Sequence, residues 1–219
     1  MKTSSSTMKD AAYGYLKKKL LDCEIPPGAA ISEMQVADEL EIGRTPVREA
    51  ILLLQKEGLV DVFARKSTCA RAISVGDVDE LYQLRKIIEP TVATQFKRQI
   101  DSERLLQFDA QFLALQDTTG YDSDREFYQL DIDFHSFIVN STDNGRLRSI
   151  FTDIMQSTYR LGIYSTIRYH NNSKRETYTE HHRIIQAVMM EDDAEIQAAF
   201  IAHINRSRMF SLKTLEAEN

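Results

Sequence analysis

From residue 74 onward, apolar residues recur every three or four positions, and no stretch alternates convincingly between apolar and polar. This spacing is typical of amphipathic helices, whereas a half-buried strand requires a period of two. The 219-residue chain has only eight glycines and four prolines, too few for the many turns of an all-β fold. The pattern therefore predicts an all-α bundle of about six helices, over residues 75–98, 102–117, 124–141, 145–168, 174–190 and 193–215.

The first 73 residues predict a second, smaller domain, so we expect domains at 1–73 and 74–219 in a mainly α chain. Its expected elements are helices over 8–22, 33–40 and 46–57 and short strands over 59–63 and 68–73. Thr45 is predicted to cap the third helix, with Pro46 at its first position, where the missing N–H costs nothing.

Four serines are each followed three residues later by an acid or an amide, the spacing of a capping box at a helix start. Each pair also precedes an apolar pattern of helical period. The pairs are Ser32 with Gln35, Ser74 with Asp77, Ser123 with Glu126, and Ser173 with Glu176.

The net charge of −6 is unevenly distributed, since residues 1–71 carry +1 and residues 72–219 carry −7. Such asymmetry suggests two parts with different partners. No apolar run is long enough to cross a membrane, and the first ten residues do not resemble a secretory signal. Two cysteines, Cys23 and Cys69, are too few for a disulfide framework, which favours a reducing cytoplasm.

Two helices joined by the short turn Glu41–Gly43 form a helix-turn-helix arrangement. Arg44 and Arg48 bracket the start of the second helix, the end that such proteins present to the major groove of double-stranded DNA. Arg65 and Lys66 lie on the predicted hairpin, where they are placed to follow the adjoining backbone. The alternative is a small helical domain whose arginines pair with neighbouring glutamates on a solvated surface.

The string Gly43-Arg44-Thr45-Pro46-Val47-Arg48-Glu49-Ala50-Ile51, with Leu54, Glu57-Gly58-Leu59-Val60 and Arg65-Lys66 after it, resembles the winged helix-turn-helix of GntR-family transcriptional regulators. The resemblance covers about residues 8–73. It implies that Arg44, Thr45 and Arg48 contact DNA, that the hairpin is the wing, and that a homodimer binds a pseudo-palindromic operator. Three residues depart from the family pattern: Gly43 replaces a serine, while Cys23 and Ser67 replace glycines.

Three histidines and one aspartate fall on the apolar faces of predicted helices. Asp131 and His135 are four residues apart and share a face, whereas His181 and His203 align with the apolar residues of two later helices. His182 is rotated about 100° from His181 and aligns poorly. Such a set suits Zn²⁺, Ni²⁺, Mn²⁺ or Fe²⁺. The alternative is a group of core histidines that neighbouring side chains satisfy.

The spacing of these residues is similar to the effector domain of the FadR branch of GntR regulators, the FCD type. The similarity consists of Asp131-x-x-x-His135, of Glu180-His181 followed by Ile184 and Ala187, and of Asp192 with His203 eleven residues later. It implies that Asp131, His135, His181 and His203 bind a divalent metal and that a small organic acid is the effector.

Arg85 shares a predicted face with Leu81, Ile88 and Val92, so its charge is expected to point inward. A buried arginine needs an anionic partner. That partner is either an internal acid such as Glu89 or the carboxylate of the effector, which Arg85 would clamp. Tyr159 and Arg160 are weaker candidates for the same cavity.

Together these observations predict a ligand-responsive transcriptional regulator that is not an enzyme. Three alternatives remain open from the residues. One is a metalloenzyme acting on a small carboxylate, since three histidines and an aspartate with an open position can activate water. The second is a regulator that senses the metal without an organic effector. In the third, the metal is purely structural.

Overall fold

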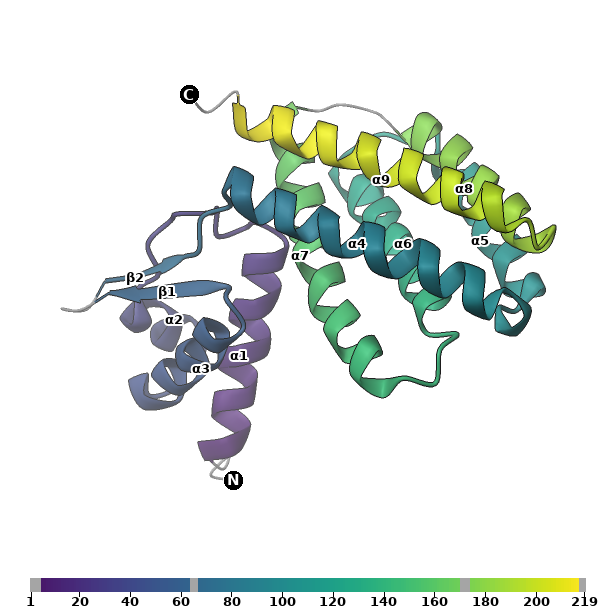
Figure 1. Ribbon diagram of the computed structural model, residues 1–219. Coiled ribbons are helices and arrows are strands. Elements are labelled where there is room, and N and C mark those ends of the chain that lie inside the picture. The colour runs from purple at the N-terminus through teal and green to yellow at the C-terminus, as the bar shows by residue number, and fades with distance from the viewer. Residues whose placement is uncertain (1–4, 64–66, 170–173, 217–219) are drawn as a thin grey trace. The chain divides into compact units, whose positions relative to one another are not determined.

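The computed structural model of the chain describes residues 5–63, 67–169 and 174–216, and it is mainly α-helical, as predicted (Figure 1). The chain divides into two compact units, Met1–Ile73 and Ser74–Asn219. We call the first the head and the second the bundle. Among the helices described, none is long and apolar enough to cross a membrane.

Within residues 5–63 and 67–73, the head contains three helices and a two-stranded antiparallel sheet. Its elements are α1 (Ser5–Leu21), α2 (Glu33–Glu39), α3 (Arg44–Lys56), β1 (Val60–Phe63) and β2 (Ser67–Ala70). α1 packs along α3 (Figure 1). The packing buries Leu16 and Leu20 of α1 and Leu54 of α3 completely, so a single apolar core holds the head together.

The hairpin pairs Val60 with Ala70 and Phe63 with Ser67. The segment before α2 adds to the sheet, since Ala30 forms an isolated bridge with Cys69. Ser67 lies in strand β2, so its backbone is extended and does not require the glycine that is usual in the family. Cys23, by contrast, has φ +53° at the end of α1, where glycine is the ordinary choice.

The turn between α2 and α3 differs in one detail from the prediction. Ser32 caps α2 by accepting from the Gln35 N–H, as predicted. α3 begins at Arg44 with Gly43 as its cap, so the prediction that Thr45 is the cap is wrong. Pro46 is the third residue of α3 and fits there equally well, because the first four N–H groups of a helix have no intrahelical partner.

The bundle contains six α-helices within the described residues, close to the predicted ranges. They are α4 (Val75–Phe96), α5 (Ser102–Leu115), α6 (Tyr121–Val139), α7 (Gly145–Tyr169), α8 (Lys174–Met189) and α9 (Asp193–Glu216), with a 3-10 turn at Lys97–Gln99. Ser74 and Asp77 form the predicted capping box at the start of α4. Ser173, the fourth predicted cap, lies outside the described residues.

The predicted cap at Ser123 is wrong, because α6 begins earlier, after Gly120 at φ +107°. Ser123 instead accepts a hydrogen bond from the Lys174 ammonium at 2.7 Å. This contact joins the start of α6 to the start of α8.

Neighbouring helices pack in a ring-like order through the bundle: α4 lies against α9, α9 against α8, α8 against α5, and α6 against α7 and α4 (Figure 1). Most of the enclosed residues are apolar, including Phe108, Phe112, Phe134 and Phe200. The same interior also encloses Arg85, Glu89, Asp131, His135, His181 and His203. Charged groups are seldom buried without partners, so this polar set marks the candidate functional site.

Candidate metal centre and adjoining cavity

The structure brings together the four side chains that the sequence singled out as metal ligands. Asp131 and His135 come from α6, His181 from α8 and His203 from α9. All four are buried, and one ligand atom from each lies within 4.8 Å of those of the others. Their convergence follows from their positions on the inward faces of three helices that share one core.

The carboxylate of Asp131 lies beside two of the imidazoles. Its Oδ1 atom is 3.2 Å from His181 Nε2 and 3.8 Å from His135 Nε2. The ring of His203 stacks on that of His135, with centroids 5.0 Å apart. The four side chains therefore form one compact cluster rather than separate pairs.

Two glutamates contact the outer nitrogens of the cluster. Glu89 Oε2 lies 2.6 Å from His135 Nδ1, and Glu180 Oε2 lies 2.9 Å from His203 Nδ1. A carboxylate at the outer nitrogen orients an imidazole so that its other nitrogen faces the metal. The sequence predicts Glu89 only as a partner of Arg85. The spacing of residues along a chain does not show which side chains of separate helices face each other.

The inner nitrogens fit the requirements of a metal ion. Among the described residues, the Nε2 atoms of His135, His181 and His203 are buried and have no hydrogen-bond partner. Buried polar atoms rarely remain unpartnered. Ligands on opposite sides of one transition metal ion lie about 4.2 Å apart, since each bond is about 2.0–2.2 Å long. The spread of the four ligand atoms is close to this value, so the residues fit a divalent ion.

The protonation states also suit a cation. Burial lowers the pKa of His181 although Asp131 beside it acts in the opposite direction. Burial, together with the charges of His181 and His135, lowers the pKa of His203 well below its usual value. Burial alone would raise the pKa of Asp131, but the close approach of His181 and the presence of all three imidazoles lower it. His181 and His203 are thus favoured as neutral imidazoles and Asp131 as an ionised carboxylate, the forms that bind metals.

Arg85 lies beside the cluster. Of its two predicted partners, the internal acid Glu89 is in contact with it, and the effector carboxylate stays a prediction. Its Nε–H donates to Glu89 Oε1 at 2.6 Å, so the internal ion pair is present. Burial would raise the pKa of Glu89, but the charges of Arg85 and His135 lower it to about 2. Arg85 Nη2 is buried without a hydrogen-bond partner in the described structure. One guanidinium nitrogen therefore remains available to a second anion.

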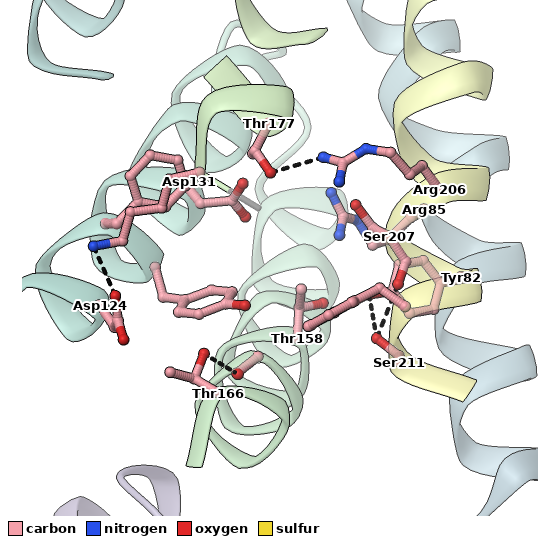
Figure 2. A pocket seen from close by; sticks show the side chains of 15 residues that line it. Tyr82, Arg85, Asp124, Asp131, Thr158, Thr166, Thr177, Arg206, Ser207 and Ser211 are labelled. Carbon is pink, nitrogen blue, oxygen red and sulfur yellow. Dashed lines mark hydrogen bonds and ion pairs between the residues drawn. The ribbon is translucent and has the colours of Figure 1, made fainter. Parts of the chain in front are cut away.

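A cavity of about 60 Å³ adjoins the cluster (Figure 2). Asp131 and Arg85 both line it, so the metal cluster and the Arg85 side chain adjoin the same space. Seven of the fifteen lining residues carry hydroxyls: Tyr82, Tyr128, Thr158, Thr166, Thr177, Ser207 and Ser211. Burial raises the pKa of Tyr82 and that of Tyr128, so both phenols keep their protons.

The predicted directions of side chains on their helices are correct at some positions and wrong at others. His181 is fully buried, whereas His182 is partly exposed and contacts Asp109 at 2.8 Å. Tyr159 and Arg160 do not line the cavity; their helix α7 contributes Thr158, Gly162 and Thr166 instead. A shift of one residue along a helix turns a side chain by about 100°, which explains the error.

In the head, the three predicted DNA contacts that the structure describes are exposed. Arg44, Thr45 and Arg48 are exposed on the first turns of α3, whose opposite face is buried in the head core. Arg44 Nη2 lies 3.8 Å from Glu33, a weak surface contact. Arg65 and Lys66, the predicted wing contacts, lie outside the described residues.

Comparison with known proteins connects the two units to one class of protein. Residues 8–69 match the gntR family of bacterial regulatory proteins, and residues 80–206 match the FCD domain. The chain therefore belongs to the GntR family of transcriptional regulators, in the group that carries an FCD domain. It is a DNA-binding transcriptional regulator and not an enzyme, so the metalloenzyme alternative is set aside.

Individual relatives agree with this assignment. The Nta operon transcriptional regulator of Aminobacter aminovorans is 30% identical over 181 residues, which cover 82% of this chain and 83% of that protein. The regulator YdhC of Bacillus subtilis is 27% identical over 195 residues, covering 88% and 86%.

Solved structures share the fold. The Escherichia coli protein McbR/YncC superposes with a TM-score of 0.75 at 16% identity, covering 95% of this chain and 98% of that one. A GntR regulator from Rhodococcus sp. RHA1 superposes with a TM-score of 0.76 at 20% identity, covering 94% and 98%.

Proposed function

We propose that this regulator responds to a small organic acid that binds beside a divalent metal in the bundle. The observation that carries the proposal is the shared cavity, which Asp131 of the four-residue cluster and Arg85 both line. Arg85 Nη2 has no hydrogen-bond partner within the described residues. When bound, the ion would supply positive charge and open coordination positions that a carboxylate can take. Zn²⁺, Ni²⁺, Mn²⁺ and Fe²⁺ all suit the donor set.

The residues of the cavity have distinct roles in this proposal. Asp131, His135, His181 and His203 hold the ion, while Glu89 and Glu180 orient two of the imidazoles from outside. Arg85 Nη2 donates to the carboxylate of the acid. Glu89 keeps the guanidinium in place by accepting a hydrogen bond from Arg85 Nε–H. A planar guanidinium is suited to carboxylates because it donates in a fixed geometry.

The head is proposed to read DNA with the start of α3. Arg44, Thr45 and Arg48 would contact the major groove, and Arg65 and Lys66 of the wing would contact the adjoining backbone. A homodimer in the cytoplasm would place two such helices on the half-sites of a pseudo-palindromic operator. The acid changes operator affinity only if it binds more tightly to one arrangement of the heads than to the other.

Native mass spectrometry of the purified protein, before and after mild denaturation, tests this proposal. We expect a dimer with one metal ion per chain and a small organic mass. His181→Ala should lose both the ion and the response of operator binding to acids, whereas the adjacent control His182→Ala should keep them. Metal retained in His181→Ala and lost in His182→Ala would overturn the assignment of the centre.

The two remaining alternatives make different predictions for the same protein. If the metal itself is the signal, operator affinity follows metal concentration with no organic acid present. If the metal is only structural, its removal by a chelator lowers the free energy of unfolding without changing regulation. A ligand that binds only the folded protein stabilises it by about 4 kcal/mol at a thousandfold excess over its Kd.

A further inference from the structure

The hydroxyls at one end of the cavity have already used their hydrogens. Thr158, Thr166 and Ser211 each donate to the main-chain carbonyl four residues earlier, at 2.9, 3.1 and 3.0 Å. A hydroxyl has one hydrogen to donate but two lone pairs to accept with. These three oxygens can therefore only accept hydrogen bonds from a ligand. Thr166 already accepts one from the Tyr128 phenol, which leaves it one lone pair.

Tyr82 extends this accepting surface. Its phenol oxygen lies 3.0 Å from Ser211 Oγ. Because the hydrogen of Ser211 points at the Ser207 carbonyl, the hydrogen between the two oxygens belongs to Tyr82. In Figure 2, Thr158, Thr166 and Ser211 lie at the lower side of the cavity, and Asp131 and Arg85 lie above them. The cavity thus has a cationic end, once a metal is bound, and an accepting end.

The cations around the cavity are already matched by carboxylates of the protein. Lys174 and Arg206 line the cavity together with Arg85. Their pairs are Arg85 with Glu89, Lys174 with Asp124, and Arg206 with Glu180. A divalent ion beside Asp131 then leaves one uncompensated positive charge. One carboxylate neutralises that charge, and a second would be buried without a counter-ion.

The volume limits the length of the ligand. A cavity of about 60 Å³ holds about four to six waters at roughly 10–15 Å³ each. The same number of waters occupies on the order of 150 Å³ of liquid at about 30 Å³ per molecule. Acids of about four to six carbons match this space.

We propose that the effector is a compact monocarboxylate that carries hydroxyl groups away from its carboxylate, as in a short sugar acid. The carboxylate lies at the metal and Arg85, and the hydroxyls donate to Thr158, Thr166, Ser211 and Tyr82. A second carboxylate finds only acceptors at that end. An ammonium group is disfavoured because it would add a buried positive charge, and the neighbouring carboxylates Glu89, Asp124 and Glu180 are already paired. This inference rests on the proposed function and adds the chemical class of the ligand.

Titration calorimetry of the metal-loaded full chain tests the inference with acids of equal length. The four-carbon set is 2,3,4-trihydroxybutanoate, butanoate, succinate and 4-aminobutanoate. Gluconate, hexanoate and adipate form the six-carbon set. We expect the hydroxylated acid of a set to bind at least about tenfold more tightly than the others, since each hydrogen bond gained is worth about 0.5–1.5 kcal/mol.

Variants separate the hydroxyl contacts from the carboxylate contact. Thr158→Val and Thr166→Val should each weaken binding of the hydroxylated acid about three- to tenfold and leave the weak binding of the plain acid unchanged. Thr152→Val is the matched control. Thr152 lies on the same helix and makes the same bond to the carbonyl four residues earlier, at 2.9 Å, but it is exposed. Thermal unfolding of each variant verifies that it is folded.

The outcomes distinguish the two levels of the proposal. Tighter binding of succinate, 4-aminobutanoate or the plain acid would overturn the hydroxyl inference and leave the acid-binding pocket intact. Equal losses in Thr158→Val and Thr152→Val would also overturn it. If no acid in either set binds the metal-loaded protein, the proposed function fails, and the inference fails with it.

Discussion

The head and the bundle place their charged functional residues on opposite sides of their cores. In the head, the first turns of α3 expose Arg44 and Arg48, while the opposite face of the helix packs Val47, Ala50 and Leu54 into an apolar core cluster. In the bundle, Arg85, Glu89 and the three histidines are buried, with exposed fractions of 0–1%. A large partner such as DNA is met at the surface, whereas a small ligand can be enclosed.

This difference has an energetic consequence. An exposed charge costs little to keep or to change, because water solvates it. A buried charge depends on each of its neighbours, because an unpaired one is expensive in a medium of low polarity. Substitutions of the exposed charges on α3 should therefore alter DNA binding without altering folding. Substitutions of the buried charges in the bundle should alter both stability and ligand binding.

The largest effect is expected for Glu89→Gln, which removes the negative charge between Arg85 and His135. Breaking a buried ion pair typically costs about 3–5 kcal/mol, and we expect that loss in the free energy of unfolding measured with urea. Glu33→Gln is the control in the head, because its pair with Arg44 is exposed and should be worth at most about 1 kcal/mol. Similar losses in the two variants would remove the contrast between the units.

Arg48→Ala should weaken operator binding by about 1–3 kcal/mol if the side chain reads a base, without changing metal content or the unfolding midpoint. Fluorescence anisotropy with labelled DNA at fixed salt measures this effect. Arg98→Ala removes the same charge from an exposed pair with Glu191 in the bundle. Equal weakening by both substitutions would show that net charge, and not α3, controls binding.

Replacing a helical glycine by alanine should change the free energy of unfolding in opposite directions in the two units. A methyl group at Gly162 of α7 would lie 2.5 Å from the Tyr128 ring, so Gly162→Ala should cost about 1–3 kcal/mol and move a wall of the cavity. Gly14 of α1 has nothing within 4 Å, and Gly14→Ala should stabilise the head by about 0.5–1 kcal/mol. Differential scanning calorimetry measures both changes. A stable Gly162→Ala variant with unchanged ligand binding would contradict the close contact.

The smallest effect should be alike in the two units. Glu41 in the head and Glu191 in the bundle have φ values of +54° and +53°, which residues other than glycine rarely adopt. Glu41→Gly and Glu191→Gly should each stabilise the protein by about 0.5–1 kcal/mol, because the strain is relieved. Chemical denaturation resolves such differences. Destabilisation by more than that amount would indicate that these side chains make contacts that outweigh the strain.

The sequence predicted helices well because their periodicity is local. The six helices of the bundle and the two helices around Glu41–Gly43 follow from spacing alone, to within a few residues at each end. The errors lie at helix starts. Thr45 and Ser123 are residue types that are common at N-caps. The cap position is decided by the backbone angles that the surrounding packing allows, and Gly43 and Gly120 occupy it.

For the site, the sequence determined which face of each helix carries a polar residue, and this placed Asp131, His135, His181 and His203 inward. Only the tertiary structure decided that one ligand atom from each of the four converges and that Glu89 and Glu180 contact two of the outer nitrogens. It also decided that the hydroxyls of Thr158, Thr166 and Ser211, whose hydrogens are already donated, line one cavity. The physical reason is that periodicity reports the direction of a side chain from its own helix axis. It contains no information on which side chain of a distant helix lies opposite.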